Sequence, residues 1–345
     1  MKYRSIRVVK FYFILIYIAM LTSCASSESD TNPHNTKGYE GFRTQITINN
    51  DIGLQVTQDS LLAMAMTGIA NQRAYQHSFA VYRKDIGEQQ SASPGSSEVI
   101  RSRAVNRVGD CGGQASFQFQ YHDGASQRYA SAEAVFNNYC VSNIVLTGTM
   151  HSTVNDQALT MNVSYDDLEI KTYTVDQNLL DSMLLNGEVD YQFLEDFQAG
   201  TLQVKLVIDN KVLSQEDNRV TYWLDNVEVE HLHSPGTYDE QWSGKIYISD
   251  YGYVDISTPD ILVAPNFNVY LLQGEVSIRG ANDGQLLLSV LSEQEKAQFV
   301  SDNPSRIAGD FNLEIVEDIE SEDTIHVINT WANISGYPFF VFRGS

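Results

Sequence analysis

The chain has 345 residues, of which 43 % are hydrophobic and 11 % aromatic, and its formal net charge is −22. This composition excludes an intrinsically disordered protein, and the length gives one large or two ordinary domains enough apolar residues for a core. The negative charge excludes nucleic acid and anionic lipid head groups as attractive partners, because both are repelled by such a protein.

The first 23 residues have the pattern of a secretory signal peptide. Four cations precede an apolar run from Phe11 to Met20, and the run ends at Leu21-Thr22-Ser23-Cys24. The cations stay on the cytoplasmic side while the apolar run enters the bilayer. The alternative is an uncleaved transmembrane helix. The charge-free stretch from Phe11 to Ser27 has only 17 residues, however, at the short end of the roughly 17–25 that span a membrane.

The tetrad that ends at Cys24 resembles the lipobox of bacterial lipoproteins. The resemblance implies that the Cys24 thiol receives a diacylglycerol and that cleavage precedes Cys24. The freed amine then takes a third acyl chain, such as palmitate. Two or more chains give stable membrane anchoring, since each buried CH₂ contributes about 0.8 kcal/mol. Ala25, where Asp would favour retention at the inner membrane, implies the outer membrane, on its periplasmic or its surface face.

The mature chain from Cys24 would have 322 residues. Because the signal carries four cations and no acid, its removal takes the charge from −22 to −26. Residues 24–40 are rich in Ser, Asn and Asp and are expected to form a flexible tether. A helix is expected over Thr57–Tyr75, capped by Thr57 or Asp59, with apolar residues every four positions from Leu61.

Two cysteines, Cys111 and Cys140, follow the lipobox. In an exported chain, such a pair predicts one disulfide. Gln114–Tyr121 alternates polar and apolar residues, Asp123-Gly124 is a turn signal, and Ser131–Val141 has the character of a second strand. A near-symmetric hairpin about this turn would set the two cysteines opposite each other. Metal binding by the two cysteines, with no His cluster nearby, is disfavoured.

From Cys111 onward, short alternating runs separated by Asn, Asp and Gly predict a mainly β fold of antiparallel sheets or sandwich-like modules, with one or two short helices. A second helix is expected over Ser292–Val300, where Ser292 and Glu295 form a capping box. The expected strands are Leu159–Tyr165, Leu168–Val175, Leu202–Ile208, Arg219–Val229, Lys245–Ile248, Tyr253–Ile256, Val269–Ile278, Leu286–Val290, Phe311–Val316 and Thr324–Ile328.

Internal similarity suggests two related β-rich domains. Asp166–Ile170 resembles Asp225–Val229, and several expected strands carry a glycine followed two residues later by an apolar residue. The preferred division is an N-terminal domain over 41–176, with one helix and the disulfide hairpin, and a C-terminal domain over 190–345. Chance similarity among amphipathic strands is the alternative.

The common catalytic motifs are absent from the sequence: there is no G-x-S-x-G, H-E-x-x-H, P-loop or G-x-G-x-x-G. Two histidines, His231 and His233, form the sharpest local pattern, because residues two apart on a strand share a face and could hold one metal ion. A solvent-facing strand end explains them better, so no metal or other cofactor is expected. Arg101 and Arg103 likewise share a strand face, for which pairing with acids is the favoured explanation.

Three segments, Cys111-Gly112-Gly113, Asn138-Tyr139-Cys140 and Gly252–Thr258, have a texture similar to that of uncharacterised β-rich lipoproteins of proteobacteria. This resemblance implies no activity. The sequence therefore predicts a lipid-anchored envelope protein with a binding or structural role, with the membrane and an envelope protein or glycan as partners. The alternative is a secreted-type hydrolase that acts on glycan through paired carboxylates, which need no local motif.

Overall fold

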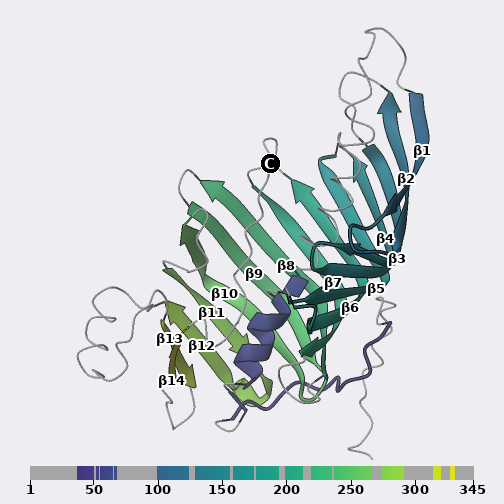
Figure 1. Ribbon diagram of the computed structural model, residues 1–345. Helices are drawn as coiled ribbons and strands as arrows, with labels where there is room; N and C mark the ends of the chain where they lie inside the picture. Colours follow the sequence, from purple (N-terminus) through teal and green to yellow (C-terminus); the bar gives the residue numbers. More distant parts are fainter. Residues whose placement is uncertain are drawn as a thin grey trace, which may run out of the picture. The chain divides into compact units, whose positions relative to one another are not determined.

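The computed structural model describes residues 37–49, 52–53, 55–64, 66–67, 99–123, 129–155, 158–174, 176–193, 199–212, 219–234, 237–265, 273–290, 314–319 and 327–330. These residues form a single antiparallel sheet of 14 strands in which each strand pairs with its neighbours in sequence. The prediction of a mainly β, antiparallel fold is thus confirmed, in the form of one sheet with one helix against it (Figure 1).

Most of the sheet keeps the two-residue alternation of buried and exposed side chains that strand geometry produces. A 3₁₀ turn, η2, covers Ala281–Asp283 between the eleventh and twelfth strands. The strands are β1 Val99–Val108, β2 Gln114–Asp123, β3 Tyr129–Val141, β4 Ile144–Asn155, β5 Thr160–Tyr173, β6 Leu179–Phe193, β7 Ala199–Val212, β8 Arg219–Ser234, β9 Thr237–Ile248, β10 Gly252–Pro265, β11 Gln273–Arg279, β12 Gln285–Val290, β13 Glu314–Ile319 and β14 Val327–Thr330.

The sheet is continuous across the expected domain junction. β5 precedes it, β6 runs through it, and the two strands pair from Thr160↔Gln192 to Tyr173↔Leu179. Residues 35–345 form one compact unit. The expected junction at 176–190 therefore falls on a turn and a strand inside one sheet.

Two faces of the sheet differ sharply. On the face that we call inner, alternate residues of β2–β12 join one large apolar core, with fully buried members such as Phe117, Leu168 and Tyr222. The helix over residues 53–67 adds Val56 and Leu61 to this core. The face that we call outer carries the intervening side chains, most of them polar.

The helix begins earlier than expected. The Asn49 side chain accepts a hydrogen bond from the Ile52 amide (3.2 Å), so Asn49 caps the helix in place of Thr57 or Asp59. Thr57 and Asp59 lie inside it and are buried. The signal in the sequence that was missed is an Asn directly before the first turn. The expected end at Tyr75, the second helix at Ser292–Val300 and the signal peptide lie outside the described residues.

The helix is fixed to the sheet by a buried hydrogen bond. The Tyr222 hydroxyl of β8 donates to Asp59 Oδ1 (2.8 Å), and Gln55 Nε2 donates to Asp59 Oδ2 (3.0 Å). Burial raises the pKa of Asp59, and the two hydrogen bonds oppose that shift only in part.

We predict that this carboxyl makes the protein more stable as the pH falls. Because the pKa of Asp59 is higher in the folded than in the unfolded chain, the folded state binds the proton first. The contribution to the free energy of unfolding is fully present below about pH 4, where the unfolded Asp also titrates, and it is lost as the pH rises through the folded pKa. Urea unfolding at several pH values should show this gain in the native protein and not in Asp59→Asn. Exposed Asp260→Asn is the control, and identical pH profiles for native protein and Asp59→Asn would contradict the assignment.

Residues 37–48, which we call the N-terminal strap, begin on the outer face and end beside β10, where Ile46 and Ile48 join the inner core. Lys37 pairs with Asp166 and Asp167 on β5 (2.6 and 2.8 Å). Tyr39 then packs on Trp223 of β8 and Tyr247 of β9, with ring centroids 5.7 and 5.9 Å apart. Of the expected tether over 24–40, residues 37–40 are described, and Lys37 and Tyr39 among them contact the sheet; its other residues lie outside the described part of the chain.

The strap follows one line of the sheet. Val207, Trp223, Tyr247 and Tyr253 are successive register partners on β7–β10, so their side chains form a row perpendicular to the strands. Tyr39 completes an apolar cluster with the first three of them. Farther along, the amide of Ile46 donates to the Tyr253 carbonyl (2.9 Å), which closes a short parallel bridge to β10.

The internal sequence similarity has a structural cause. The two similar segments that begin at Asp166 and Asp225 both contain a β-bulge, and the second residue of each has positive φ (47° and 51°). Glycines stand opposite these bulges. A Cβ at Gly148 would lie 2.1 Å from the Asp167 carbonyl oxygen, and one at Gly244 would lie 2.6 Å from a neighbouring Cα. The repeated pattern is therefore that of a bulge and its facing glycine.

Candidate functional site

A row of polar side chains crosses the outer face from β4 to β8. Its members are register partners: Thr153 faces Asn162, Asn162 faces Asp190, Asp190 faces Gln203, and Gln203 faces Glu228. Neighbouring strands lie about 4.8 Å apart, so the row presents one polar group per strand at a regular spacing. We call these five residues the polar ladder.

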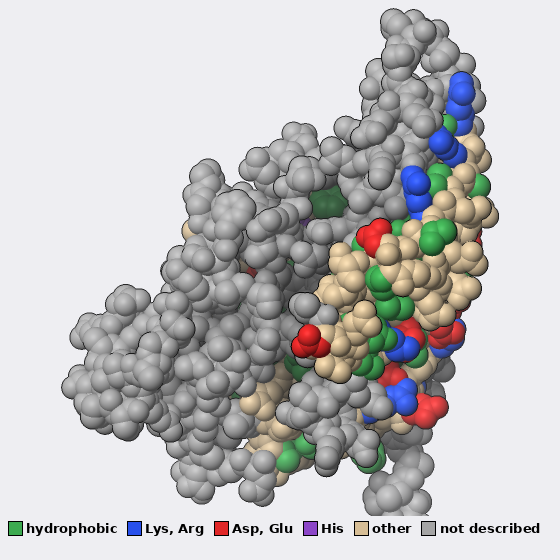
Figure 2. All heavy atoms as spheres, in the orientation of Figure 1, with side chains coloured by type: hydrophobic (Ala, Val, Ile, Leu, Met, Phe, Trp, Pro, Cys, Tyr) green, Lys and Arg blue, Asp and Glu red, His purple; other side chains and the backbone are tan. Residues whose placement is uncertain are grey.

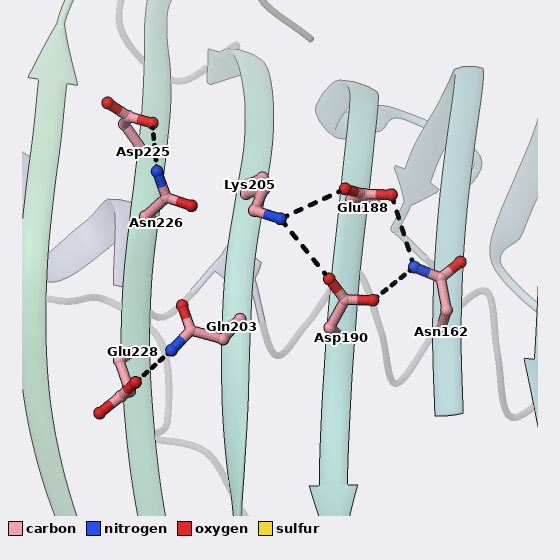
Figure 3. Close-up of polar contacts among 8 residues, drawn as sticks. All are labelled: Asn162, Glu188, Asp190, Gln203, Lys205, Asp225, Asn226 and Glu228. Atoms are coloured by element: carbon pink, nitrogen blue, oxygen red, sulfur yellow. Dashed lines mark hydrogen bonds and ion pairs between the residues drawn. The ribbon is translucent and has the colours of Figure 1, made fainter. Parts of the chain in front are cut away.

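Contacts between strands hold the centre of the ladder in place (Figure 3). Asn162 Nδ2 donates to Asp190 Oδ1 (2.7 Å) and to Glu188 Oε2 (3.5 Å). Lys205 Nζ lies 3.5 Å from Glu188 and 3.7 Å from Asp190, with a quarter of its side chain exposed. Because ion pairs at such exposure contribute at most about 1 kcal/mol, their main effect here is to orient the side chains.

The β7–β8 part of the ladder is also paired. Gln203 Nε2 donates to Glu228 Oε2, so an amide oxygen and a carboxylate oxygen remain directed away from this bond (Figure 3). Asn162, Asp190, Gln203 and Glu228 each lie between inward-facing apolar residues of their strands, such as Val189 and Val204, and Thr153 lies between Ser152 and Val154. The alternation of the strands therefore turns the ladder side chains outward.

A hollow of about 400 Å³ lies along the ladder. Most of its lining side chains carry a hydroxyl or an amide group, and a single carboxylate, that of Asp190, is among them. The lining residues are Thr153, Val154, Asn155, Thr160, Met161, Asn162, Asp190, Tyr191, Gln192, Thr201 and Gln203. Hydroxyls and amides both donate and accept hydrogen bonds, so the hollow suits a ligand that does the same.

The two cysteines lie where the hairpin argument places them. β2 and β3 pair with Gln114 opposite Asn137, and the same register, continued by three residues, sets Cys111 opposite Cys140. The structure joins them in a disulfide with their Cα atoms 5.2 Å apart. The bond fastens the β1–β2 turn to β3. Cys24 lies outside the described residues.

The two histidines lie on β8. His231 is 8 % exposed, and its register partner is Glu240 of β9, which is also buried. Trp242 Nε1 donates to Glu240 Oε2 (3.0 Å). His233 pairs with Tyr238. Within the described ranges, no group of three or more His, Cys, Asp or Glu side chains is arranged to hold a metal ion.

The arginines of β1 face the inner side of the sheet. Arg101 is the register partner of Tyr121, and Arg103 is the partner of Phe119, so the two arginines share one face as the sequence predicts. Figure 2 shows Lys and Arg side chains gathered over this edge strand, at the upper right. Charged residues that point inward on an edge strand oppose pairing with the strand of another molecule.

Sequence reasoning did not single out the ladder. Its residues occupy the outward positions of amphipathic strands, where polar side chains are expected in any antiparallel sheet. The signal lies in the register, which aligns the five residues across strands and which the sequence does not contain.

Comparisons with known proteins bear on neither fold nor site. No family model, no curated protein and no solved structure matches this chain. In the described part of the chain, every helix is too short or too polar to cross a membrane.

Proposed function

We propose that this chain is a lipid-anchored protein of the bacterial envelope, attached to the outer membrane through Cys24, and that it binds an envelope component on its outer face without chemical turnover. The lipobox supports the anchor. The observation that carries the binding role is the polar ladder beside a hollow of about 400 Å³. Side chains that are already oriented by one another lose little freedom when a ligand binds, so the ladder is preorganised for recognition.

The alternative is hydrolysis of a glycan, and the arrangement of the adjacent pair Glu188 and Asp190 does not favour these two as the catalytic carboxylates. Glycosidases place two carboxyl groups on either side of the scissile bond, about 5–10 Å apart. Glu188 and Asp190 instead project from one face of one strand, and both contact Asn162 and Lys205. They thus lie beside a bound ligand rather than around it.

The test uses the purified full-length protein with insoluble cell-wall and polysaccharide fractions of the envelope. We expect saturable retention of the protein on one fraction, with no release of soluble fragments. Release that stops in Asp190→Asn or Glu188→Gln, with the fold intact and the control Asp260→Asn still active, would establish a hydrolase instead. Absence of retention on every envelope fraction, and of release, would contradict a binding role.

A further inference from the structure

We infer that the polar ladder binds an extended, uncharged polysaccharide that lies across strands β4–β8. The inference rests on the proposed function and names its ligand class. It follows from the direction and spacing of the ladder, from the chemistry of its side chains and from their charge.

The direction of the ladder favours a polymer. Because its members are register partners, the ladder runs perpendicular to the strands, from Thr153 on β4 to Glu228 on β8. Five strands about 4.8 Å apart give a length of about 19 Å. A linear polysaccharide has polar groups at regular intervals along an extended backbone. Such a chain can place a hydroxyl beside each residue of the polar ladder, whereas a compact ligand cannot.

The side chains along the hollow fit hydroxyl groups. Gln203 has a second amide hydrogen to donate beside its bond to Glu228, whereas Asn162, whose amide hydrogens go to Glu188 and Asp190, and Asp190 itself can accept. Together these side chains can bind both atoms of a hydroxyl. A second row along the same hollow, made by Asn155, Thr160, Gln192 and Thr201, repeats this chemistry one step along the strands. Two polar rows side by side match a ring that carries hydroxyls on both edges.

The charges select against anionic ligands. Glu188, Asp190 and Glu228 contribute three carboxylates near the ladder, and among the described residues Lys205 contributes an ammonium that contacts two of them. An acidic glycan would therefore meet net repulsion, and the formal charge of −22 on the whole chain adds to it. A neutral glycan does not meet this electrostatic repulsion.

A protein partner fits the ladder less well. Hot spots of protein interfaces are dominated by large side chains that fill pockets, above all Trp, Tyr and Arg. Among the described residues, the exposed large hydrophobic side chains lie outside the hollow; they are Phe42, Val108, Val135, Leu232 and Ile261. The hollow thus offers hydrogen bonds rather than an apolar anchor.

The test is calorimetric titration of the full-length protein with neutral linear oligosaccharides of several linkages, from monosaccharide to hexasaccharide, and with uronic acid oligosaccharides. We expect one neutral series to bind, with an affinity that rises with length until the oligomer spans the ladder. Gln203→Ala should weaken binding by about fivefold, the loss expected for one neutral hydrogen bond. Gln118→Ala, an exposed glutamine on β2, is the matched control and should bind as the native protein does.

Three results would overturn the inference. They are equal affinity of Gln203→Ala and native protein, tighter binding of the acidic series, and no binding of any oligosaccharide. If the protein still adheres to an envelope fraction in the last case, the proposed binding role stands and only the ligand class is wrong. If the protein adheres to no envelope fraction, the proposed binding role and the ligand class are both wrong. Circular dichroism and the unfolding midpoint of Gln203→Ala show that the variant is folded.

Discussion

Replacing Cys111 and Cys140 by serine is expected to lower the free energy of unfolding by about 3–4 kcal/mol. The bond closes a loop of 29 residues in sequence separation, and in the loop-entropy model a cross-link of this length destabilises the unfolded chain by that amount. It also fastens the turn that joins β1 to β2 onto β3, so the effect should appear as loosening of the edge of the sheet. Chemical denaturation of the native and double-serine proteins measures it.

Reduction supplies the control for this prediction. A reducing agent should destabilise the native protein to the level of the double-serine variant and leave that variant unchanged. Mass mapping of alkylated, unreduced protein that finds both cysteines as free thiols would refute the disulfide.

If the proposed lipid anchor is correct, changing Cys24→Ser is expected to abolish acylation and to leave an unlipidated precursor. Without the thiol no diacylglycerol can be added, and the signal peptide is not processed in the manner of a lipoprotein. In the proposed anchor two or more acyl chains would give stable attachment, so the unlipidated precursor should not accumulate in the outer membrane. Incorporation of labelled palmitate and separation of inner from outer membranes by density measure both effects.

Ser27→Ala, which leaves the lipobox intact, is the matched control and should be labelled and sorted as the native protein is. Equal labelling of Cys24→Ser and native protein would show that Cys24 is not the acylated residue. Recovery of the native protein in the inner membrane would contradict the inference drawn from Ala25.

The fold class could be read from the sequence because alternation reports which side chains face the core. The alternation did not predict the strand bounds correctly where a bulge interrupts it. Leu159–Tyr165 and Leu168–Val175 were expected as two strands, and they are the two halves of β5, Thr160–Tyr173, on either side of the bulge at Asp167. The similarity of two segments, interpreted as a sign of related modules, coincides with a bulge in each. A bulge depends on the facing strand, which local sequence does not identify.

The disulfide was predictable because a hairpin is a local structure, whose two strands are joined by a short turn. The ladder was not, because Asn162, Asp190 and Gln203 come from three strands and become neighbours only through register. The helix could be predicted only in part. Its apolar face was visible, while the cap at Asn49 was overlooked in favour of Thr57 and Asp59, both of which are buried.

The central claim is that the outer face of β4–β8 is the binding surface. Carbodiimide footprinting tests it directly, because this reagent modifies exposed carboxylates and mass spectrometry locates each modification. With the bound envelope fraction present, Glu188, Asp190 and Glu228 should be protected, while Asp260 on β10, outside the proposed surface, is modified as before. Unchanged modification of these three carboxylates, with protection elsewhere in the protein, would contradict the account.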